Sequence, residues 1–331
     1  MEDELNNKHR AARVDIRREV LEAEEKIRPH IRETPVDFSP TLSRAGTCQA
    51  YLKLENLQIT GSFKLRGAMN KLLSLDEDER KRGVVTASTG NHGAAVAYAV
   101  TKLNCPGTIY LPENAAPAKV AALRLYGVAL RLYGSDCVET ELFAKEAAAS
   151  SQQAYISPYN DAQIIGGQGT IGVELARQLE AINAVLVPVG GGGLISGIAG
   201  YLKSFDSAIE IVGCQPANSA VMYESIKAGK ILDLASQPTI SDGTAGGIEA
   251  GTISFALCQR YVDDYVLVTE EEIKAAIRLV LETHHMLIEG AAALPVACFL
   301  KAKQRFRNRN VVLILSGARL GLTVLKEVLR P

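Results

Sequence analysis

Short runs of valine, isoleucine and leucine alternate with helix-like amphipathic segments along most of this chain. An uninterrupted apolar run of this kind is typical of a parallel strand that is buried on both faces of its sheet. The alternation of such runs with helices predicts an α/β fold built on open parallel sheets. The clearest runs are 84–88, 108–111, 128–133, 184–189, 210–214 and 311–315.

Local signals predict where two of the helices begin. The apolar spacing over 14–27 predicts an amphipathic helix, and the mixed charges of 1–18 argue against a signal peptide there. Thr269 and Glu272 form a capping-box pattern that precedes a predicted helix over 273–285.

Three of the apolar runs end in small polar residues or glycines and then pass into a helix-like pattern. In open α/β sheets, ligands bind outside the carboxyl ends of the strands. We therefore expect the three segments to meet at one edge of a sheet. They are Ser88-Thr89-Gly90-Asn91-His92-Gly93, Gly190-Gly191-Gly192-Gly193 and Ser316-Gly317-Ala318-Arg319.

The second of these segments consists of four glycines. Glycines let successive backbone N–H groups approach an anion closely, and the helix that follows adds the positive end of its dipole. The pattern predicts a phosphate-binding loop; the alternative is a tight strand-to-helix turn, which needs fewer glycines. The segment lacks the Gly-Lys-Ser/Thr ending of a nucleoside-triphosphate loop and the G-x-G-x-x-G spacing of a dinucleotide site.

Lys64 stands in a turn flanked by Gly61 and Ser62, between the apolar residues Phe63 and Leu65. Such surroundings desolvate an ammonium group and lower its pKa, so that the amine is unprotonated near neutral pH. An unprotonated amine forms a Schiff base with a carbonyl, and the usual carbonyl for this chemistry is pyridoxal 5′-phosphate. Taken alone, a structural lysine is the favoured interpretation, so this prediction depends on the other segments.

The segment that begins at Ser88 has residues suited to a small anionic substrate. The hydroxyls of Ser88 and Thr89, with backbone N–H groups at a helix start, can hold a carboxylate. The amide of Asn91 can bond a phenolic oxygen. Simple helix capping is the alternative for the two hydroxyls. We interpret His92 as a loop histidine with satisfied hydrogen bonds, because nothing pairs it with a nucleophile.

Together these motifs resemble those of the fold-type II pyridoxal-phosphate enzymes of the serine/threonine dehydratase and serine racemase family. They occur in one order and with family-like spacing, from about residue 31 to the last predicted helix. The shared motifs are Gly61-Ser62-Phe63-Lys64-Leu65-Arg66-Gly67-Ala68, Ser88-Thr89-Gly90-Asn91-His92-Gly93, Gly167-Gln168-Gly169-Thr170, the four glycines, Ser241-Asp242-Gly243 and Ser316-Gly317.

The resemblance implies roles for individual residues. Lys64 is expected to form the Schiff base and to act as the base, and Thr89 is expected to stand on the opposite face of the substrate. Asn91 would bond the ring oxygen, Ser316 would face the pyridine nitrogen, and Glu289 would lie near the ring. The expected cofactor-binding residues are Lys64, Phe63, Asn91, Gly190, Gly191, Gly192, Gly193, Leu194, Glu289 and Ser316. The expected substrate-binding residues are Ser88, Thr89, Gly90, Asn91 and His92.

The resemblance also implies the architecture. It implies two open parallel-sheet domains with helices on both faces: a large cofactor-binding domain over 1–76 and 158–331, and a small domain over 77–157 inserted in it. The charged run 76–82 is expected to be a solvated helix end at that boundary. A homodimer is expected by resemblance, and we expect no carboxyl-terminal regulatory domain like that of biosynthetic threonine dehydratases.

The activity implied is β-elimination of a β-hydroxy amino acid such as L-threonine or L-serine, to give a 2-oxo acid and ammonia. A hydroxyl at the pyridine nitrogen leaves the ring largely neutral, which favours prompt loss of a β-leaving group. Serine or hydroxyaspartate racemisation on the same scaffold is the main alternative. Further alternatives are a dehydratase of a hydroxyectoine-derived amino acid, a β-replacement enzyme and a cofactor-binding protein without turnover.

The chain departs from the family pattern at several positions. Thr89 stands where similar dehydratases carry alanine and racemases carry serine. Gln215 and Val221 replace two carboxylates of the family's divalent-cation loop, which also includes Ser219, so no metal site is expected. Arg319 replaces an asparagine; it either binds a second anionic group of the substrate or forms a salt bridge outside the pocket. Tyr159 replaces phenylalanine or asparagine.

Composition excludes several other classes of protein. The chain has 331 residues and a net charge of −1, without the basic excess of a nucleic-acid-binding protein. No apolar run approaches the roughly 18 residues of a membrane span. The six cysteines are scattered and form no C-x-x-C motif, which fits a reduced cytoplasmic setting without a zinc site.

Overall fold

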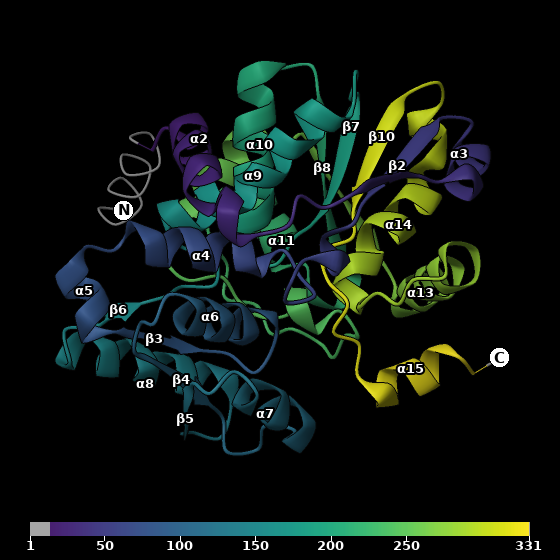
Figure 1. Cartoon of the computed structure of the whole chain (residues 1–331). Coiled ribbons are helices and arrows are strands. Elements are labelled where there is room, and N and C mark those ends of the chain that lie inside the picture. The colour runs from purple at the N-terminus through teal and green to yellow at the C-terminus, as the bar shows by residue number, and fades with distance from the viewer. Residues whose placement is uncertain (1–13, 331) are drawn as a thin grey trace.

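The computed structural model describes residues 14–330, and the predicted polar start of the chain over 1–13 lies outside the described residues. Its strands form two separate sheets with helices packed around them (Figure 1). The predicted α/β fold is confirmed.

The larger sheet has six strands in the order β1-β2-β10-β7-β8-β9. All neighbours are parallel except β1, which runs antiparallel to β2 at the edge. The edge strand β1 is the exception to the predicted parallel arrangement, because its connection to β2 through the short helix α3 (Pro40–Gly46) is shorter than a parallel crossover needs. The strands are β1 (Val36–Phe38), β2 (Gln49–Lys53), β7 (Ala184–Pro188), β8 (Glu210–Pro216), β9 (Asp264–Val268) and β10 (Asn310–Ile314).

The smaller sheet has four strands, all parallel, in the order β5-β4-β3-β6. The strands are β3 (Val84–Ala87), β4 (Gly107–Leu111), β5 (Ala129–Leu132) and β6 (Ala154–Tyr155). All four fall within the predicted small domain over 77–157, whose boundaries stay a prediction.

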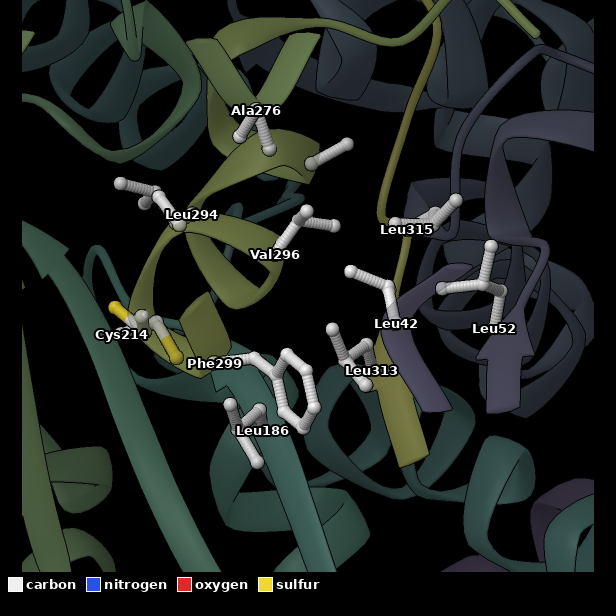
Figure 2. Packing of buried hydrophobic residues seen from close by; sticks show 14 of the residues in the cluster. Leu42, Leu52, Leu186, Cys214, Ala276, Leu294, Val296, Phe299, Leu313 and Leu315 are labelled. Atoms are coloured by element: carbon white, nitrogen blue, oxygen red, sulfur yellow. The ribbon is translucent and has the colours of Figure 1, made fainter. Parts of the chain in front are cut away.

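Helices cover both faces of the larger sheet, and the strand residues alternate between them. Leu186 of β7 packs into one apolar cluster with Phe299, whereas its neighbours Val185 and Val187 pack into a second cluster with Ile198. Figure 2 shows the first cluster, which α13 and α14 close from one side. Longer helices are α2 (Ile16–Ile27), α4 (Lys64–Ser74), α6 (Asn91–Lys102), α8 (Cys137–Ser150), α9 (Ala162–Gln178), α10 (Gly193–Phe205), α13 (Glu270–His284) and α14 (Gly290–Ala302).

Two local predictions have different outcomes. The capping box of Thr269 and Glu272 is confirmed, and α13 begins at Glu270, three residues before the predicted start. The charged run is a short helix of its own, α5 (Glu77–Arg82), rather than a helix end, because Asp76 and Glu79 form a second capping box. The remaining helices are α7 (Pro117–Arg124), α11 (Val221–Ala228), α12 (Ile253–Tyr261) and α15 (Leu322–Val328). Within residues 14–330, no helix is both long and apolar enough to cross a membrane.

Candidate active site

The three predicted segments follow strands β3, β7 and β10. The expectation that they meet at one edge of a single sheet is wrong, because β3 belongs to the smaller sheet and β7 and β10 to the larger one, and the apolar runs do not record which strands pair. The turn that carries Lys64 is joined directly to the segment after β10. Ser62 and Gly317 form an isolated antiparallel bridge, and the backbone N–H of Phe63 donates to the carbonyl of Ser316 at 3.1 Å. A second hydrogen bond runs from the N–H of Ala318 to the carbonyl of Gly61 at 2.9 Å. This pairing places Lys64 beside Ser316.

Lys64 is the first residue of α4, and its side chain is half-buried. Its Nζ donates to the carbonyl of Pro158 at 2.8 Å and lies 5.2 Å from the centroid of the Phe63 ring. Burial lowers the pKa of Lys64 to about 8, although the negative charge of Glu289 opposes that shift. The direction of the shift agrees with the prediction, but a pKa of about 8 leaves most of the amine protonated at pH 7.

Glu289 directly precedes α14 and links two of the segments. The amide of Asn91 donates to its two carboxylate oxygens at 2.8 and 2.9 Å, and the backbone N–H of Arg319 donates at 3.0 Å. Burial raises the pKa of Glu289 to about 7, while the hydrogen bonds from Asn91 oppose the shift. A Cβ on Gly317 would lie 2.4 Å from a carboxylate oxygen of Glu289, so a side chain there would displace the carboxylate from its hydrogen bonds.

The glycine segment forms a tight concave loop between β7 and α10. Gly192 has a φ of +85°, a conformation that residues with a side chain rarely adopt. A Cβ on Gly191 would lie 2.5 Å from the ring of Tyr159, so the aromatic ring packs directly on the loop. Ser254 Oγ fixes the same peptide by donating to the carbonyl of Gly191 at 2.5 Å. Sequence reasoning noted Tyr159 only as a departure and missed Ser254, which has no local signal.

The loop after β3 leads into α6 without a side-chain cap. Gly90 is the capping residue, and Ser88 Oγ accepts a hydrogen bond from Gly90 N–H at 3.2 Å. The capping alternative for Ser88 and Thr89 is thus not observed, and their predicted contact with a substrate carboxylate stays a prediction. His92 is buried and its Nε2 hydrogen-bonds the carbonyl of Ile156 at 2.9 Å; burial lowers its pKa to about 3.

The satisfied state predicted for His92 is confirmed, although it lies in the first turn of α6 rather than in a loop. Because Nε2 is committed to the carbonyl of Ile156, the substrate contact that the resemblance implies would fall to another group of His92. That contact stays a prediction.

Several polar groups around Lys64 are buried and lack a hydrogen-bond partner among residues 14–330. They are Ser62 Oγ, Asn91 Oδ1 and Ser316 Oγ, and Ser316 is only 1% exposed. Buried polar groups normally have partners, so a cluster without them indicates a ligand. The residues fit pyridoxal phosphate: Ser316 would meet its ring nitrogen and the glycine loop its phosphate. Asn91 directs its N–H groups to Glu289, so its bond to the ring oxygen stays a prediction.

The residues at the family's cation-loop positions bond to the protein itself. Gln215 Oε1 accepts from the N–H of Tyr223 at 2.8 Å, and Ser219 Oγ shares a hydrogen bond of 2.8 Å with Ser236 Oγ. Val221 is buried. In the described part of the chain, no group of three or more histidine, cysteine, aspartate or glutamate residues is placed to hold a metal. The absence of a metal stays a prediction.

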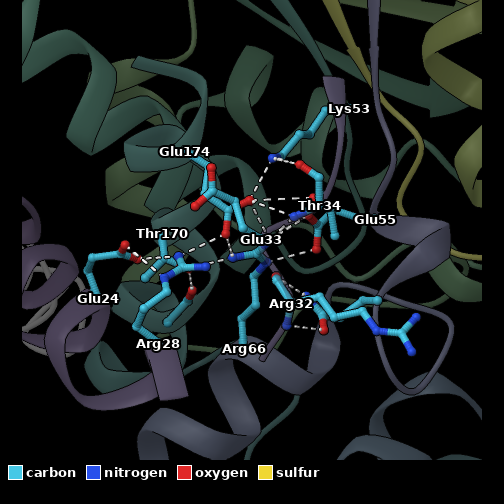
Figure 3. A network of polar contacts seen from close by, with 12 residues as sticks. Glu24, Arg28, Arg32, Glu33, Thr34, Lys53, Glu55, Arg66, Thr170 and Glu174 are labelled. Carbon is cyan, nitrogen blue, oxygen red and sulfur yellow. Dashed lines mark hydrogen bonds and ion pairs between the residues drawn. The ribbon is translucent and has the colours of Figure 1, made fainter. Parts of the chain in front are cut away.

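Behind Lys64 lies a buried ionic network that sequence reasoning missed (Figure 3). Arg66 donates to Glu55 at 2.7 and 2.8 Å and to Glu174 at 2.7 and 2.9 Å. Lys53 Nζ donates to Glu174 at 2.6 Å, and the side chains of all four residues are fully buried. Burial alone would raise the pKa of Glu174, but the positive charge and hydrogen bonds of Arg66 act in the opposite direction and hold it at about 2. The available signal was Glu174, which interrupts a long stretch of small and apolar residues in α9.

Comparison with known proteins agrees with this geometry. The model of the family "Pyridoxal-phosphate dependent enzyme" matches residues 27–317. The catabolic L-threonine dehydratase of Staphylococcus aureus is 39% identical over 315 residues, which cover 94% of this chain and 91% of that protein. The L-threonine ammonia-lyase of Thermotoga maritima is 37% identical over 311 residues, covering 94% of this chain and 77% of that protein.

Two solved structures extend the comparison to the fold. Threonine deaminase isoform 2 of Solanum lycopersicum, in its processed form, superposes with a TM-score of 0.91 at 35% identity, covering 95% of this chain and 92% of that chain. Maize serine racemase superposes with a TM-score of 0.88 at 32% identity, covering 94% and 95% of the two chains. The chain is a fold-type II member of the pyridoxal-phosphate-dependent enzyme family.

Proposed function

We propose that this protein catalyses β-elimination of a β-hydroxy amino acid such as L-threonine or L-serine, with release of a 2-oxo acid and ammonia. The observation that carries the proposal is the pKa of Lys64, which burial lowers to about 8 beside the unpartnered Ser316 hydroxyl. The similarity to threonine dehydratases over nearly the whole chain supports the same reaction.

Bound pyridoxal phosphate supplies the electron sink that makes the Cα–H bond of an amino acid acidic. Lys64 Nζ takes up the Cα proton, which its lowered pKa allows close to neutral pH. Ser316 would present a hydroxyl, and not a carboxylate, to the ring nitrogen. A hydroxyl does not keep that nitrogen protonated, which favours departure of the β-hydroxyl as water. Addition of water then releases ammonia and the 2-oxo acid.

The loop after β3 orients the substrate. The uncapped N–H groups at the start of α6 and the hydroxyls of Ser88 and Thr89 hold the α-carboxylate. Asn91 and Glu289 brace this loop against the segment after β10. The substrate's Cα–H bond is thereby held toward Lys64.

Racemisation is the second candidate, and one residue favours it. Inversion at Cα needs an acid on the face opposite Lys64, and the Thr89 hydroxyl is the group the motif supplies for that. Its methyl group crowds that face, however, so we expect elimination to exceed inversion.

The experiment is a 2-oxo acid assay with L-serine and L-threonine, combined with chiral analysis and solvent deuterium incorporation at Cα. Thr89→Ala should keep substantial elimination from the L-substrate and lose about 10²-fold or more of any inversion, the usual scale for one general acid. Thr89→Ser is the matched control that retains the hydroxyl. Faster inversion of L-serine than pyruvate formation in the unmodified protein would refute the dehydratase assignment.

Further properties belong to the same proposal. The division into a large domain over 1–76 and 158–331 and a small one over 77–157 is supported by the two separate sheets. A reducing, cytoplasmic location is supported by six cysteines that are all free thiols. We retain the homodimer, on the family resemblance alone, and the expectation that no nucleic acid or membrane is a partner.

A further inference from the structure

Arg319 is a cation at the edge of the site that forms no ion pair within residues 14–330. It lies in the segment between β10 and α15 and is half-buried. Its Nε is buried and has no hydrogen-bond partner among residues 14–330, and its guanidinium forms no ion pair with any acidic side chain in that range. Arginine stays protonated in proteins, so it cannot relieve this desolvation by losing its charge.

Glu289 and Asp242, whose charges interact with each other, are otherwise engaged. Glu289 accepts a hydrogen bond from the backbone N–H of Arg319, at 3.0 Å, and not from its guanidinium. Asp242 pairs with Lys119 at 3.2 Å. The duller interpretation of Arg319, a salt bridge outside the pocket, is therefore not observed in the described part of the chain.

The backbone contacts of the segment connect Arg319 to the proposed substrate-binding loop. Glu289 connects its backbone to Asn91 in the loop after β3, which is the proposed carboxylate-binding loop. The neighbouring Ala318 is bonded to Gly61 in the turn that carries Lys64. The proposed phosphate loop, in contrast, follows a different strand, β7, and is packed against Tyr159.

We propose that Arg319 binds a second carboxylate on the substrate, so that the preferred substrates are dicarboxylic β-hydroxy amino acids of the 3-hydroxyaspartate class. This inference rests on the proposed elimination reaction. A planar guanidinium binds a carboxylate through two parallel hydrogen bonds, which an asparagine at this position does not reproduce. The balanced reaction converts 3-hydroxyaspartate to oxaloacetate and ammonia: water leaves across Cα–Cβ and is returned on release of ammonia.

The test compares specificity constants for threo- and erythro-3-hydroxyaspartate, L-threonine and L-serine in the holoenzyme and in Arg319→Asn. We expect the preference for 3-hydroxyaspartate over L-serine to fall by about 10- to 100-fold, the scale for a hydrogen-bonded charge pair. Arg319→Lys, which keeps the charge but loses the planar fork, should fall in between. Arg278→Asn is the matched control, because that exposed guanidinium bonds only the carbonyl of Arg330.

A binding measurement separates this inference from the proposed reaction. Calorimetry of the holoenzyme with succinate and with butyrate measures the contribution of the second carboxylate to binding without turnover. Arg319→Asn should weaken the binding of succinate about tenfold and leave the binding of butyrate little changed. An equal loss for all substrates, or unchanged succinate binding, would overturn the role of Arg319. A reduced affinity for pyridoxal phosphate in Arg319→Asn would assign the guanidinium to the cofactor instead. If no amino acid is eliminated yet succinate binding depends on Arg319, the reaction is wrong and the anion site stands.

Discussion

Two polar regions meet at the start of α4, and they are built in opposite ways. Arg66 lies in the network with Glu55 and Glu174, where its guanidinium nitrogens donate to carboxylates or to Thr170 and the side chains are fully buried. Lys64, two residues earlier, faces Ser316 and other buried polar groups that have no partner within residues 14–330.

The difference separates what stabilises the fold from what binds a ligand. Removing one member of a satisfied buried network leaves a charge uncompensated, which costs folding free energy. Removing a group that has no partner costs the apoprotein little, because no hydrogen bond is lost. Substitutions in the two regions should therefore be distinguishable by stability and by cofactor binding.

The largest effect is expected at Lys64. Lys64→Ala should lower elimination by at least about 10³-fold, because one side chain serves as both nucleophile and base. Borohydride reduction of the unmodified holoenzyme, followed by peptide mapping, should place the cofactor on the peptide that holds Lys64. Label on another lysine would contradict the assignment. The unfolding free energy of the apoprotein serves as the control for a folded variant.

Arg66→Met should destabilise the apoprotein by about 3–5 kcal/mol, since it leaves Glu55 and Glu174 buried without their shared cation. Urea unfolding at pH 7 measures the loss. Lys81→Met is the control: its ion pair with Glu77 is exposed, and its removal should cost less than about 1 kcal/mol. Similar losses for the two variants would mean that the buried network does not stabilise the fold.

Glu289 should make stability depend on pH in a defined direction. Its folded pKa of about 7 lies above the usual value of 4.5, so the neutral form is the stabilised one. That contribution is complete below about pH 4.5 and is lost as the pH rises through 7, a change of about 3 kcal/mol. Glu289→Gln, which cannot ionise, should gain stability relative to the unmodified apoprotein over this range. His92 titrates in both proteins, so its contribution cancels when the unfolding free energies of the two proteins are subtracted. A difference in unfolding free energy that does not change with pH would refute the raised pKa of Glu289.

The smallest effect on stability is expected at Ser316. Ser316→Ala should change the unfolding free energy of the apoprotein by less than about 1 kcal/mol, because the hydroxyl has no partner within the described residues. The same variant should bind pyridoxal phosphate several-fold more weakly, up to about tenfold, and the absorption spectrum of the holoenzyme should shift. Unchanged affinity and spectrum would show that Ser316 does not meet the ring.

The apolar runs and their polar ends could be predicted because burial on both faces and glycine-rich turns leave local signals. The lowered pKa of Lys64 was predictable for the same reason. The network of Arg66 and Glu174 was not, since its pairs join residues far apart in the sequence. The contact between Tyr159 and Gly191 is equally non-local. The antiparallel direction of β1 depends on the length of its connection to β2, which the apolar pattern does not record.

The order of strands in the larger sheet has a consequence for biosynthesis. β10 lies between β2 and β7, and the segment that follows it pairs with the turn of Lys64. Until the ribosome has delivered β10, β2 and β7 each present an unpaired edge, which is a site for association with other chains. The nascent chain therefore depends on a late, long-range pairing, and slow folding with a need for chaperone protection is the expected result.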